Sequence, residues 1–419
     1  MLHLFEAMGI ELEYMIVRES DLSTQPVSDQ LLRNAAKSTD SWPSEIVLQD
    51  TGWSNELVMH VIEFKTPKPI IDLAVASSRF ATAVQQANRI LSKLDEPCML
   101  LGTSAHPFFN PKTDVYLWPH ESNEIYESYD RIFGCKGHGW SNLQSMHINL
   151  PFADDFEFAR LHAAIRIILP FLSSLAASSP FIESKATGYF DTRLQYYATN
   201  QSRIPSISGE VIPEAVFSIQ EYHDKILQPM YNDIAPFDQA NILQNEWLNS
   251  RGAIARFDRM AIEIRTLDIQ ECTVIDIAIA AFVFLAVKAL CDERFSSLKQ
   301  LQSVPTTPLA ILLQQSSKTG RHTQVTDPQI LECFGRTSPV SIKAILNQIH
   351  QTIASDFSIV ADSQADTFRN RIQFLIDNGS VAERMLQYTR QDNKNDLTNL
   401  YQNLTLCLSE NRPLIVHQS

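Results

Sequence analysis

The alternation of apolar and polar residues along the chain predicts short strands interspersed with long helices. Segments in which every second residue is aliphatic or aromatic indicate strands, and apolar residues at helical spacing indicate amphipathic helices. The expected strands lie near Gly9–Val17, Leu57–Thr66, Met99–Ser104, Leu143–Leu150 and Met260–Leu267, and the expected helices near Ile70–Leu94, Phe156–Ala177, Phe217–Tyr231 and Val274–Asp292.

The character of the chain changes after about Ser296, where Gln, Asn and Ser become frequent and helical periodicity dominates. No internal repeat and no low-complexity linker separates this section from the rest, so we expect it to pack on the preceding part. The sequence therefore predicts two parts, residues 1–295 with the sheet and residues 296–419 as a helical section. The 12 glycines in 419 residues disfavour a hairpin-rich architecture, so an α+β fold with a modest sheet fits better.

Two carboxylates stand two residues apart in the segment GIELEY, Gly9 to Tyr14. In an extended chain Glu11 and Glu13 share one face of the strand, and the apolar residues between and beside them share the other. Taken alone, this segment fits a strand with one solvated face, and a metal site is the alternative.

Other predicted strands repeat the same alternation, which gives a sheet with one apolar face and one face that carries ionisable groups. A merely solvated face should mix in Lys, Thr and Ser to dilute the repulsion between carboxylates. Clustered carboxylates need cations, and hard oxygen ligands select Mg²⁺ or Mn²⁺, which usually share their coordination with substrate phosphates. This reasoning points to ATP. The residues concerned are Glu63 and Lys65, with Glu56 at the start of their strand, His147 and Asn149, and Glu263 and Arg265.

Composition narrows the class of partner. Lys and Arg number 34 against 48 Asp and Glu, without a dense basic run, so nucleic acid is not an expected partner. The chain contains neither G-x-x-x-x-G-K-[ST] nor G-x-G-x-x-G, so no glycine-rich loop is available to cradle phosphates. Metals and Arg side chains would have to hold a nucleotide.

The six cysteines lie far apart without C-x-x-C spacing, which predicts buried thiols in a reducing compartment. The first residues show no basic region followed by an apolar stretch and a cleavage site, so we expect a cytoplasmic protein. The apolar segment Val274 to Leu290 carries the charges of Asp276 and Lys288, and the uncharged stretch between them is too short for a membrane span. It is expected to be a core helix, and no membrane partner is expected.

The chain resembles the glutamate–cysteine ligases of the second bacterial type and their carboxylate–amine ligase relatives, which share the glutamine synthetase-like fold. The resemblance rests on GIELEY, ELVMHVIEFKTP, GTSAHPF, MHINLPF, LPFLSSLAASSPF running into ATGYFDTR, and MAIEIRTLD, in the family's order over roughly Gly9 to Leu290. It implies a curved antiparallel sheet, with helices on its apolar face, that forms a funnel.

The resemblance also implies roles for particular residues. Five acidic residues would hold two or three Mg²⁺ ions around the ATP phosphates, and His147 would reach the nucleotide or its metal. Arg265 and Arg193 would lie near glutamate and the transferring phosphoryl group, whereas Lys185 and Thr187 would be polar groups at the nucleotide and substrate. The five acidic residues are Glu11, Glu13, Glu56, Glu63 and Glu263.

Three positions depart from the family pattern. Where many relatives have His-x-His-x-Gly, this chain has Ser145, His147 and Asn149. Where relatives often have Ser two positions before the arginine, this chain has Asp191 before Arg193. These changes leave the identity of the amine acceptor open.

We therefore expect an ATP-dependent ligase that joins the γ-carboxylate of glutamate, or a similar carboxylate, to an amine such as cysteine, as in glutathione biosynthesis. A metal-clamped ATP suits an acyl phosphate intermediate with release of ADP and phosphate. A phosphagen-type kinase of the same fold class and a non-catalytic metabolite-binding protein are the alternatives. The expected partners are small-molecule substrates, and a homo-oligomer is possible.

Overall fold

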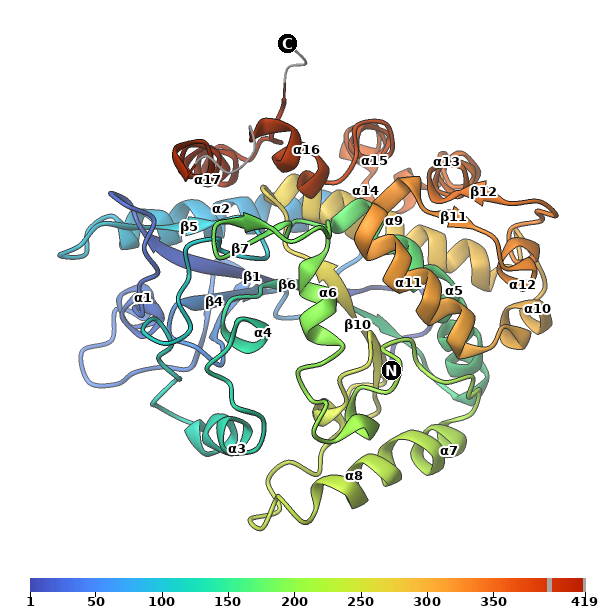
Figure 1. The fold of residues 1–419 in the computed structure, drawn as a ribbon, viewed down its shortest axis with the longest axis horizontal. Coiled ribbons are helices and arrows are strands. Elements are labelled where there is room, and N and C mark those ends of the chain that lie inside the picture. Colours follow the sequence, from blue (N-terminus) through green and yellow to red (C-terminus); the bar gives the residue numbers. More distant parts are fainter. Residues whose placement is uncertain (390–393, 417–419) are drawn as a thin grey trace.

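The protein is built around one eight-stranded antiparallel sheet, and the computed structural model describes residues 1–389 and 394–416 (Figure 1). Glu13 pairs with Glu63 on one side of the central strand and Glu11 pairs with His147 on the other. The strand order is β2 (Glu45–Leu48), β3 (Thr51–Asn55), β4 (Val61–Lys65), β1 (Gly9–Arg18), β6 (Ser145–Pro151), β10 (Ala261–Asp268) and β9 (Ala253–Arg256), and β5 (Cys98–Leu101) pairs with the end of β1.

One face of the sheet is apolar and fully covered by helices. Ile10, Phe64 and Ile148 on this face have no exposed surface. Three long helices bury it, namely α2 (Leu73–Leu91), α5 (Asp155–Ala176) and α9 (Thr273–Cys291). The first two begin where Asp72 and Asp154 accept hydrogen bonds from backbone N–H groups of the first turn, which satisfies donors that have no partner within the helix.

The opposite face carries the ionisable groups, and shorter helices stand around it (Figure 1). These are α3 (Asn123–Phe133), α4 (His138–Ser141), α6 (Thr192–Tyr197) and α8 (Gln228–Ile234). At the far end of β1 the same face turns apolar with Met15 and Val17, which pack in a second core with Tyr401 and its neighbours. The C-terminal section therefore closes one end of the polar face.

The chain after residue 296 is largely helical and lies over α2, α5 and α9, drawn in orange to red in Figure 1. The side chains of this section join the main core, as Leu346 and Phe368 do. The division at residues 295 and 296 stays a prediction. The remaining elements are α1 (Ser28–Ala36), α7 (Ile219–Tyr222), α10 (Leu298–Ser303), α11 (Thr306–Thr319), α12 (Pro328–Glu332), α13 (Ile342–Thr352), α14 (Phe357–Ala361), α15 (Ala365–Asn378), α16 (Val381–Tyr388), α17 (Lys394–Ser409), and the short strands β7 (Phe181–Ile182), β8 (Lys185–Ala186), β11 (Gln324–Val325) and β12 (Val340–Ser341).

The predicted α+β class and the antiparallel sheet are confirmed, and each expected strand and helix has a counterpart. The helix expected at Phe217–Tyr231 is built as α7, a π-helical turn at His223–Leu227 and α8. The predicted strand Leu57–Thr66 is shorter, because its first residues form the connection from β3 to β4. The strands β2, β3 and β9 were not predicted, since they are short and lack a clear period.

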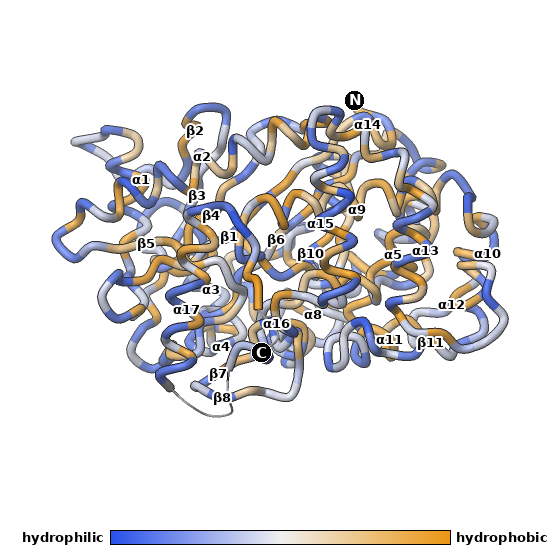
Figure 2. The backbone as a smooth tube through the Cα atoms, turned by 90° about the horizontal axis from the view of Figure 1, so that it is seen from above, coloured by the Kyte–Doolittle hydropathy of each residue, from blue (hydrophilic) through white to orange (hydrophobic). Residues whose placement is uncertain are grey.

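Helices α5 and α9 are long and apolar enough to cross a membrane by length and composition alone. However, 89% of the most apolar 18-residue stretch of α5 and 94% of that of α9 are buried inside the protein. Figure 2 shows hydrophobic residues along these helices and the central strands. The expected core helix at Val274 to Leu290 is therefore confirmed, and its apolar character on all sides reflects burial between the sheet and the C-terminal helices.

Candidate active site

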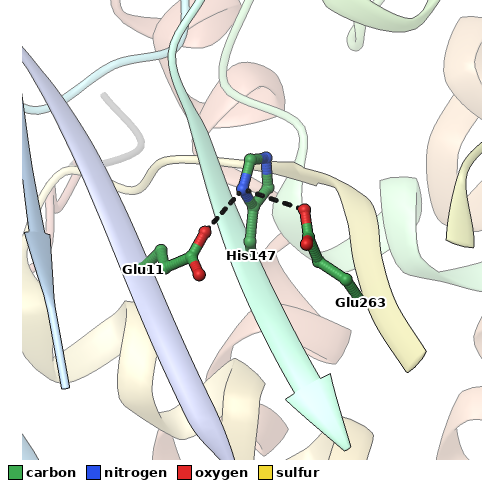
Figure 3. Close-up of side chains that lie close together, drawn as sticks. All are labelled: Glu11, His147 and Glu263. Carbon is green, nitrogen blue, oxygen red and sulfur yellow. Dashed lines mark hydrogen bonds and ion pairs between the residues drawn. The ribbon is translucent and has the colours of Figure 1, made fainter. Parts of the chain in front are cut away.

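Glu11, His147 and Glu263 come from β1, β6 and β10 and meet on the polar face (Figure 3). The His147 Nδ1 atom is 3.1 Å from Glu11 Oε2 and 3.7 Å from Glu263 Oε1. The three residues can offer ligand atoms within 4.8 Å of one another. Strand alternation places them on one face, and the antiparallel register brings them side by side.

A second group of three, Glu13, Glu56 and Glu63, meets the same distance limit. Ser54 Oγ donates a hydrogen bond of 2.7 Å to Glu63, and the backbone N–H of Ser145 donates one of 2.7 Å to Glu13. Glu56 follows β3 instead of beginning β4, which corrects the expected position at the start of that strand. The tight connection between the two strands still brings its carboxylate to the cluster.

Ser145 fixes the protonation of His147. Its hydroxyl donates to Glu13 at 2.9 Å and therefore accepts from His147 Nε2, also at 2.9 Å. Because His147 Nδ1 faces the Glu11 carboxylate, both ring nitrogens are placed to donate. Burial lowers the pKa of His147, but the hydrogen bond to Glu11 and the charge of Glu13 outweigh this effect and raise it. A divalent metal held by Glu11, Glu263 and His147 would take the place of the ring proton that faces Glu11.

The carboxylates differ in how well their charges are compensated. Burial raises the pKa of Glu11, but the hydrogen bond and charge of His147 prevail and hold it at about 2. Burial together with the charge of Glu11 raises the pKa of Glu63 to about 7. Burial and the charges of Glu13 and Glu63 raise the pKa of Glu56 well above its usual value. The cluster therefore lacks positive charge around Glu56, whereas Lys65 Nζ lies 3.5 Å from Glu63 Oε1 and only partly compensates that carboxylate.

These residues fit a divalent metal. Carboxylate oxygens are the ligands that Mg²⁺ and Mn²⁺ prefer, and the two groups of three supply five carboxylates, of which Glu56 and Glu63 have raised pKa values. One or two such cations would supply the missing positive charge. The first group of three also offers an imidazole nitrogen, and Mn²⁺ binds such a nitrogen in addition to carboxylate oxygens.

Arg265 projects from a bulge in β10. The register between β10 and β6 shifts between Ile264 and Leu267, so Arg265 and Thr266 together oppose His147. Gly252 makes room for the bulge, because a Cβ atom there would lie 2.5 Å from Cγ2 of Thr266. The Arg265 side chain lies 3.2 Å from Glu263 Oε1 and donates through Nη1 to the backbone carbonyl of Asn249 at 3.2 Å.

Arg193 is turned towards the protein. Its Nη2 donates to the carbonyl oxygen of Arg265 at 2.7 Å, and Nη1 lies 3.8 Å from Asp268 Oδ1. Asp268 is fully buried and also accepts from Ser178 N and Ser179 Oγ. Burial and the charge of Asp268 raise the pKa of the neighbouring Asp191, which caps α6 through Leu194 N. Arg193 therefore supports the Arg265 backbone, and the buried carboxylate of Asp268 lies on its other side.

A cavity of ≈ 290 Å³ opens beside the second group of carboxylates, with Glu13, Glu56, His147, Arg193 and Arg265 in its lining. Its aromatic wall was not predicted from the sequence, because the residues that form it lie on short helices and loops that bear no motif. The available signal was the helical spacing of Tyr126 and Tyr129 in α3, which supplies part of the wall. The residues of the wall are Tyr126, Tyr129, Trp140, Tyr197 and Trp247.

A larger cavity of ≈ 610 Å³ lies at the other end of the polar face, next to Glu11 and Asn149. Its lining combines apolar side chains such as Leu2 and Met260 with the cations Lys68 and Arg259. The carboxylate cluster thus lies between two openings of different size and chemistry.

Lys185 and Thr187 are not brought to the cluster. Lys185 is exposed on the small β7–β8 hairpin. The Thr187 hydroxyl is 2.6 Å from that of Thr192 and donates to the Pro180 carbonyl, so it serves the local loop. Neither residue lines either cavity beside the carboxylates.

The chain belongs to the glutamate-cysteine ligase family 2, whose model matches residues 7–403. This membership supports a carboxylate–amine ligase as the class of enzyme and confirms the resemblance seen in the motifs. The match extends well beyond Leu290 into the C-terminal helices.

The chain is 31% identical over 404 residues to an uncharacterized protein of Archaeoglobus fulgidus, covering 96% of this chain and 99% of that protein. Two solved structures share its fold at a TM-score of 0.60 and 13% identity. One is the glutamate–cysteine ligase of Francisella tularensis in complex with AMP, with 95% of this chain and 88% of that chain covered. The other is a bifunctional glutathione synthetase from Pasteurella multocida, with 96% and 52% covered.

Proposed function

We propose that this protein is an ATP-dependent ligase that joins the γ-carboxylate of glutamate, or a similar carboxylate, to an amine and releases ADP and phosphate. The observation that carries the proposal is the two clusters of three potential metal ligands on the polar face. They lie between two cavities and beside Arg265. Such a cluster suits metal-bound phosphates. Family membership and the fold of an AMP-bound ligase support the same class.

The two cavities suggest where the substrates bind. The cavity of ≈ 610 Å³ beside Glu11 has the apolar walls and the flanking cations Lys68 and Arg259 that suit a nucleotide. The cavity of ≈ 290 Å³ beside Glu56 is smaller, and Arg265 gives it a guanidinium for a carboxylate. The carboxylate cluster lies between them, where the phosphoryl group would move from one substrate to the other.

The acidic and basic residues of the site have different roles in the proposed reaction. Glu11 and Glu263 with His147, and Glu13 with Glu56 and Glu63, would hold the divalent metals, which when bound neutralise phosphate charge and stabilise the transferring phosphoryl group. Arg265 orients the acyl substrate. Arg193 keeps the Arg265 backbone in place. The aromatic wall excludes water, which protects a reactive acyl phosphate from hydrolysis.

The reaction proceeds in two steps. A γ-carboxylate oxygen attacks the γ-phosphorus of ATP, and the bond from that phosphorus to the β,γ-bridging oxygen breaks to release ADP. The amine nitrogen then attacks the acyl carbon, and phosphate leaves with the electron pair of the C–O bond. No G-x-S-x-G elbow or paired cysteine offers a nucleophile of the protein, so a covalent enzyme intermediate is not part of the proposal.

An ADP-release assay with glutamate across a panel of amines, with mass detection of products, tests the proposal. We expect ADP, phosphate and an amide in equal amounts. A stable phosphorylated acceptor would indicate a kinase instead, and binding without ADP release would indicate a metabolite-binding protein. With ¹⁸O in the γ-carboxylate, one labelled oxygen should appear in phosphate; AMP and pyrophosphate, or unlabelled phosphate, would exclude the acyl phosphate.

A further inference from the structure

The lining of the cavity beside Glu56 contains two guanidinium groups, Arg193 and Arg265, and a buried carboxylate lies beside the first. Arg193 Nη2 donates to the carbonyl of Arg265, and Nη1 is buried 3.8 Å from Asp268 Oδ1 without a hydrogen-bond partner among the described residues, so the charge of this guanidinium is opposed by the Asp268 carboxylate and not by the cavity. Arg265 uses Nε against Glu263 and Nη1 on the carbonyl of Asn249. Its Nη2 makes no hydrogen bond to the residues that the structure describes, so this atom is the free donor.

The imidazole of His147, also in the lining, is hydrogen-bonded to Glu11 and Ser145 and lies 3.7 Å from Glu263 Oε1. Arg256 and Lys65 lie on the same face of the sheet, but Arg256 pairs with Glu263, and Lys65 pairs with Glu45 and Glu63. Once the acyl substrate takes Arg265, no other described side chain of this cavity supplies a positive charge that is not already opposed by a carboxylate of the protein.

The rest of the lining favours a cation. Glu13, Glu56 and Glu63 can bring up to three negative charges to the cavity, one more than a single divalent metal between them would compensate, so a second carboxylate there would be repelled and poorly solvated. Tyr129 lies between Trp140 and Trp247, with ring centroids at 5.5 Å and 6.1 Å, and Tyr126 and Tyr197 complete the wall. Several half-buried aromatic rings beside carboxylates are the environment in which proteins bind ammonium groups by cation–π attraction.

From this count of charges we infer that the acceptor is a primary amine with an apolar or aromatic body and no carboxylate, instead of an α-amino acid. The inference rests on the proposed function and narrows its acceptor. In the reaction the ammonium R–NH₃⁺ loses one proton before it attacks the acyl phosphate and a second from the adduct. The products are a secondary amide, phosphate and a released proton, so the step balances without a further reactant.

Matched acceptor pairs that differ only by a carboxylate test the inference with the full-length protein, glutamate, Mg²⁺ and ATP. The pairs are phenethylamine against phenylalanine and cysteamine against cysteine. Hydroxylamine serves as a small acceptor that needs no recognition, and its hydroxamate product reports acyl phosphate formation separately. We expect kcat/KM to be at least tenfold higher for the amine than for the amino acid in each pair.

The outcomes separate the two levels of the proposal. Hydroxamate formation with a preference for the amino acids, or with no turnover of either member of a pair, overturns the acceptor inference and leaves the acyl phosphate standing. Absence of hydroxamate with glutamate and with other dicarboxylates overturns the proposed function and the inference together.

Variants of the aromatic wall provide a second measurement. Trp140→Leu should raise KM for phenethylamine about fivefold or more and raise KM for glutamate less, because it removes a ring face but keeps the volume apolar. Trp247→Leu serves the same purpose if the first variant does not fold. Trp42→Leu, outside the cavity lining and 40% exposed, is the matched control and should change neither constant. Equal effects on both KM values for Trp140→Leu and Trp247→Leu would contradict cation–π recognition of the acceptor.

Discussion

At the scale of single residues, the polar face is defined by which carboxylate lies beside which cation. Glu263 lies between Arg256 at 3.3 Å and Arg265 at 3.2 Å, whereas the charges nearest Glu56 are those of other carboxylates. This asymmetry supports the metal-binding hypothesis, because cations of the protein balance the charge of Glu263 but not that of Glu56.

Replacing Glu263 by Gln should abolish the stabilisation of the fold by Mg²⁺ together with a non-hydrolysable ATP analogue. For the unaltered protein we expect a gain of about 2.7 kcal/mol when the ligand exceeds its dissociation constant about a hundredfold. Thermal unfolding with and without ligands measures the difference. Glu19→Gln, at an exposed position, is the matched control. A melting shift of unchanged size in Glu263→Gln would remove this residue from the metal site.

Arg265→Lys should lose turnover by about tenfold to a hundredfold while the protein folds normally. Lysine keeps the charge but lacks the planar fork that contacts Glu263, the Asn249 carbonyl and a substrate oxygen at the same time. Steady-state kinetics and a circular dichroism melt check this expectation. The exposed Arg369→Lys should behave as the unaltered protein. Turnover near that of the unaltered enzyme would show that Arg265 does not grip the substrate.

At the scale of elements, helix α9 shows how a distant segment completes a local structure. The residue before its first turn, Cys272, makes no side-chain cap. Instead, Asn411 Oδ1 accepts hydrogen bonds from Thr273 Oγ1 at 3.0 Å and Val274 N at 2.9 Å. The C-terminal tail thereby caps the central helix of the core, and Asn411 adopts a left-handed backbone conformation with φ of 52°.

Asn411→Ala should destabilise the protein by about 1 kcal/mol or somewhat more, because it removes the cap and leaves a residue that tolerates positive φ less well. Urea unfolding at neutral pH measures the change. Asn411→Asp keeps the acceptor oxygen and adds negative charge near a helix N-terminus, so it should retain most of the stability. Equal losses in the two variants would rule out the capping contribution.

At the scale of the whole molecule, burial of neutral histidines makes stability depend on pH. Burial lowers the pKa of His60 and His106 to about 4, and burial together with the charge of Arg166 lowers that of His162 to about 3. In the unfolded chain these groups titrate near 6.5. Between about pH 6.5 and pH 4 the unfolded state therefore binds more protons than the folded state, which destabilises the fold as the pH falls.

We expect the free energy of unfolding to fall by on the order of 3 kcal/mol per buried histidine between pH 7 and pH 4 at most. Urea unfolding at several pH values measures the slope. His162→Phe should reduce the slope by the share of one histidine, since the ring already stacks on Phe158 at 5.3 Å. An unchanged slope would mean that His162 is not neutral in the folded protein.

The sequence alone determined which side chains share a face of each strand, because the alternation of side chains in a strand is a local property. Glu11 and Glu13 had to share a face, as did Glu63 with Lys65 and Glu263 with Arg265, whatever the rest of the chain did. The same holds for the apolar surface of α9, which needed burial on all sides. These patterns, with six motifs in order, sufficed for the α+β class and the family.

Tertiary structure decided everything that depends on contacts between distant segments. Register and strand order brought His147 between Glu11 and Glu263, and the short hairpin after β3 carried Glu56 to the cluster. Arg193 was expected near the substrate, which stays a prediction; it lines the smaller cavity, and its Nη2 donates to the Arg265 carbonyl in the bulge of β10. The aromatic wall as a whole bears no local signature, since Tyr129 and Trp247 are far apart in the chain and meet only where the segments around the polar face pack together.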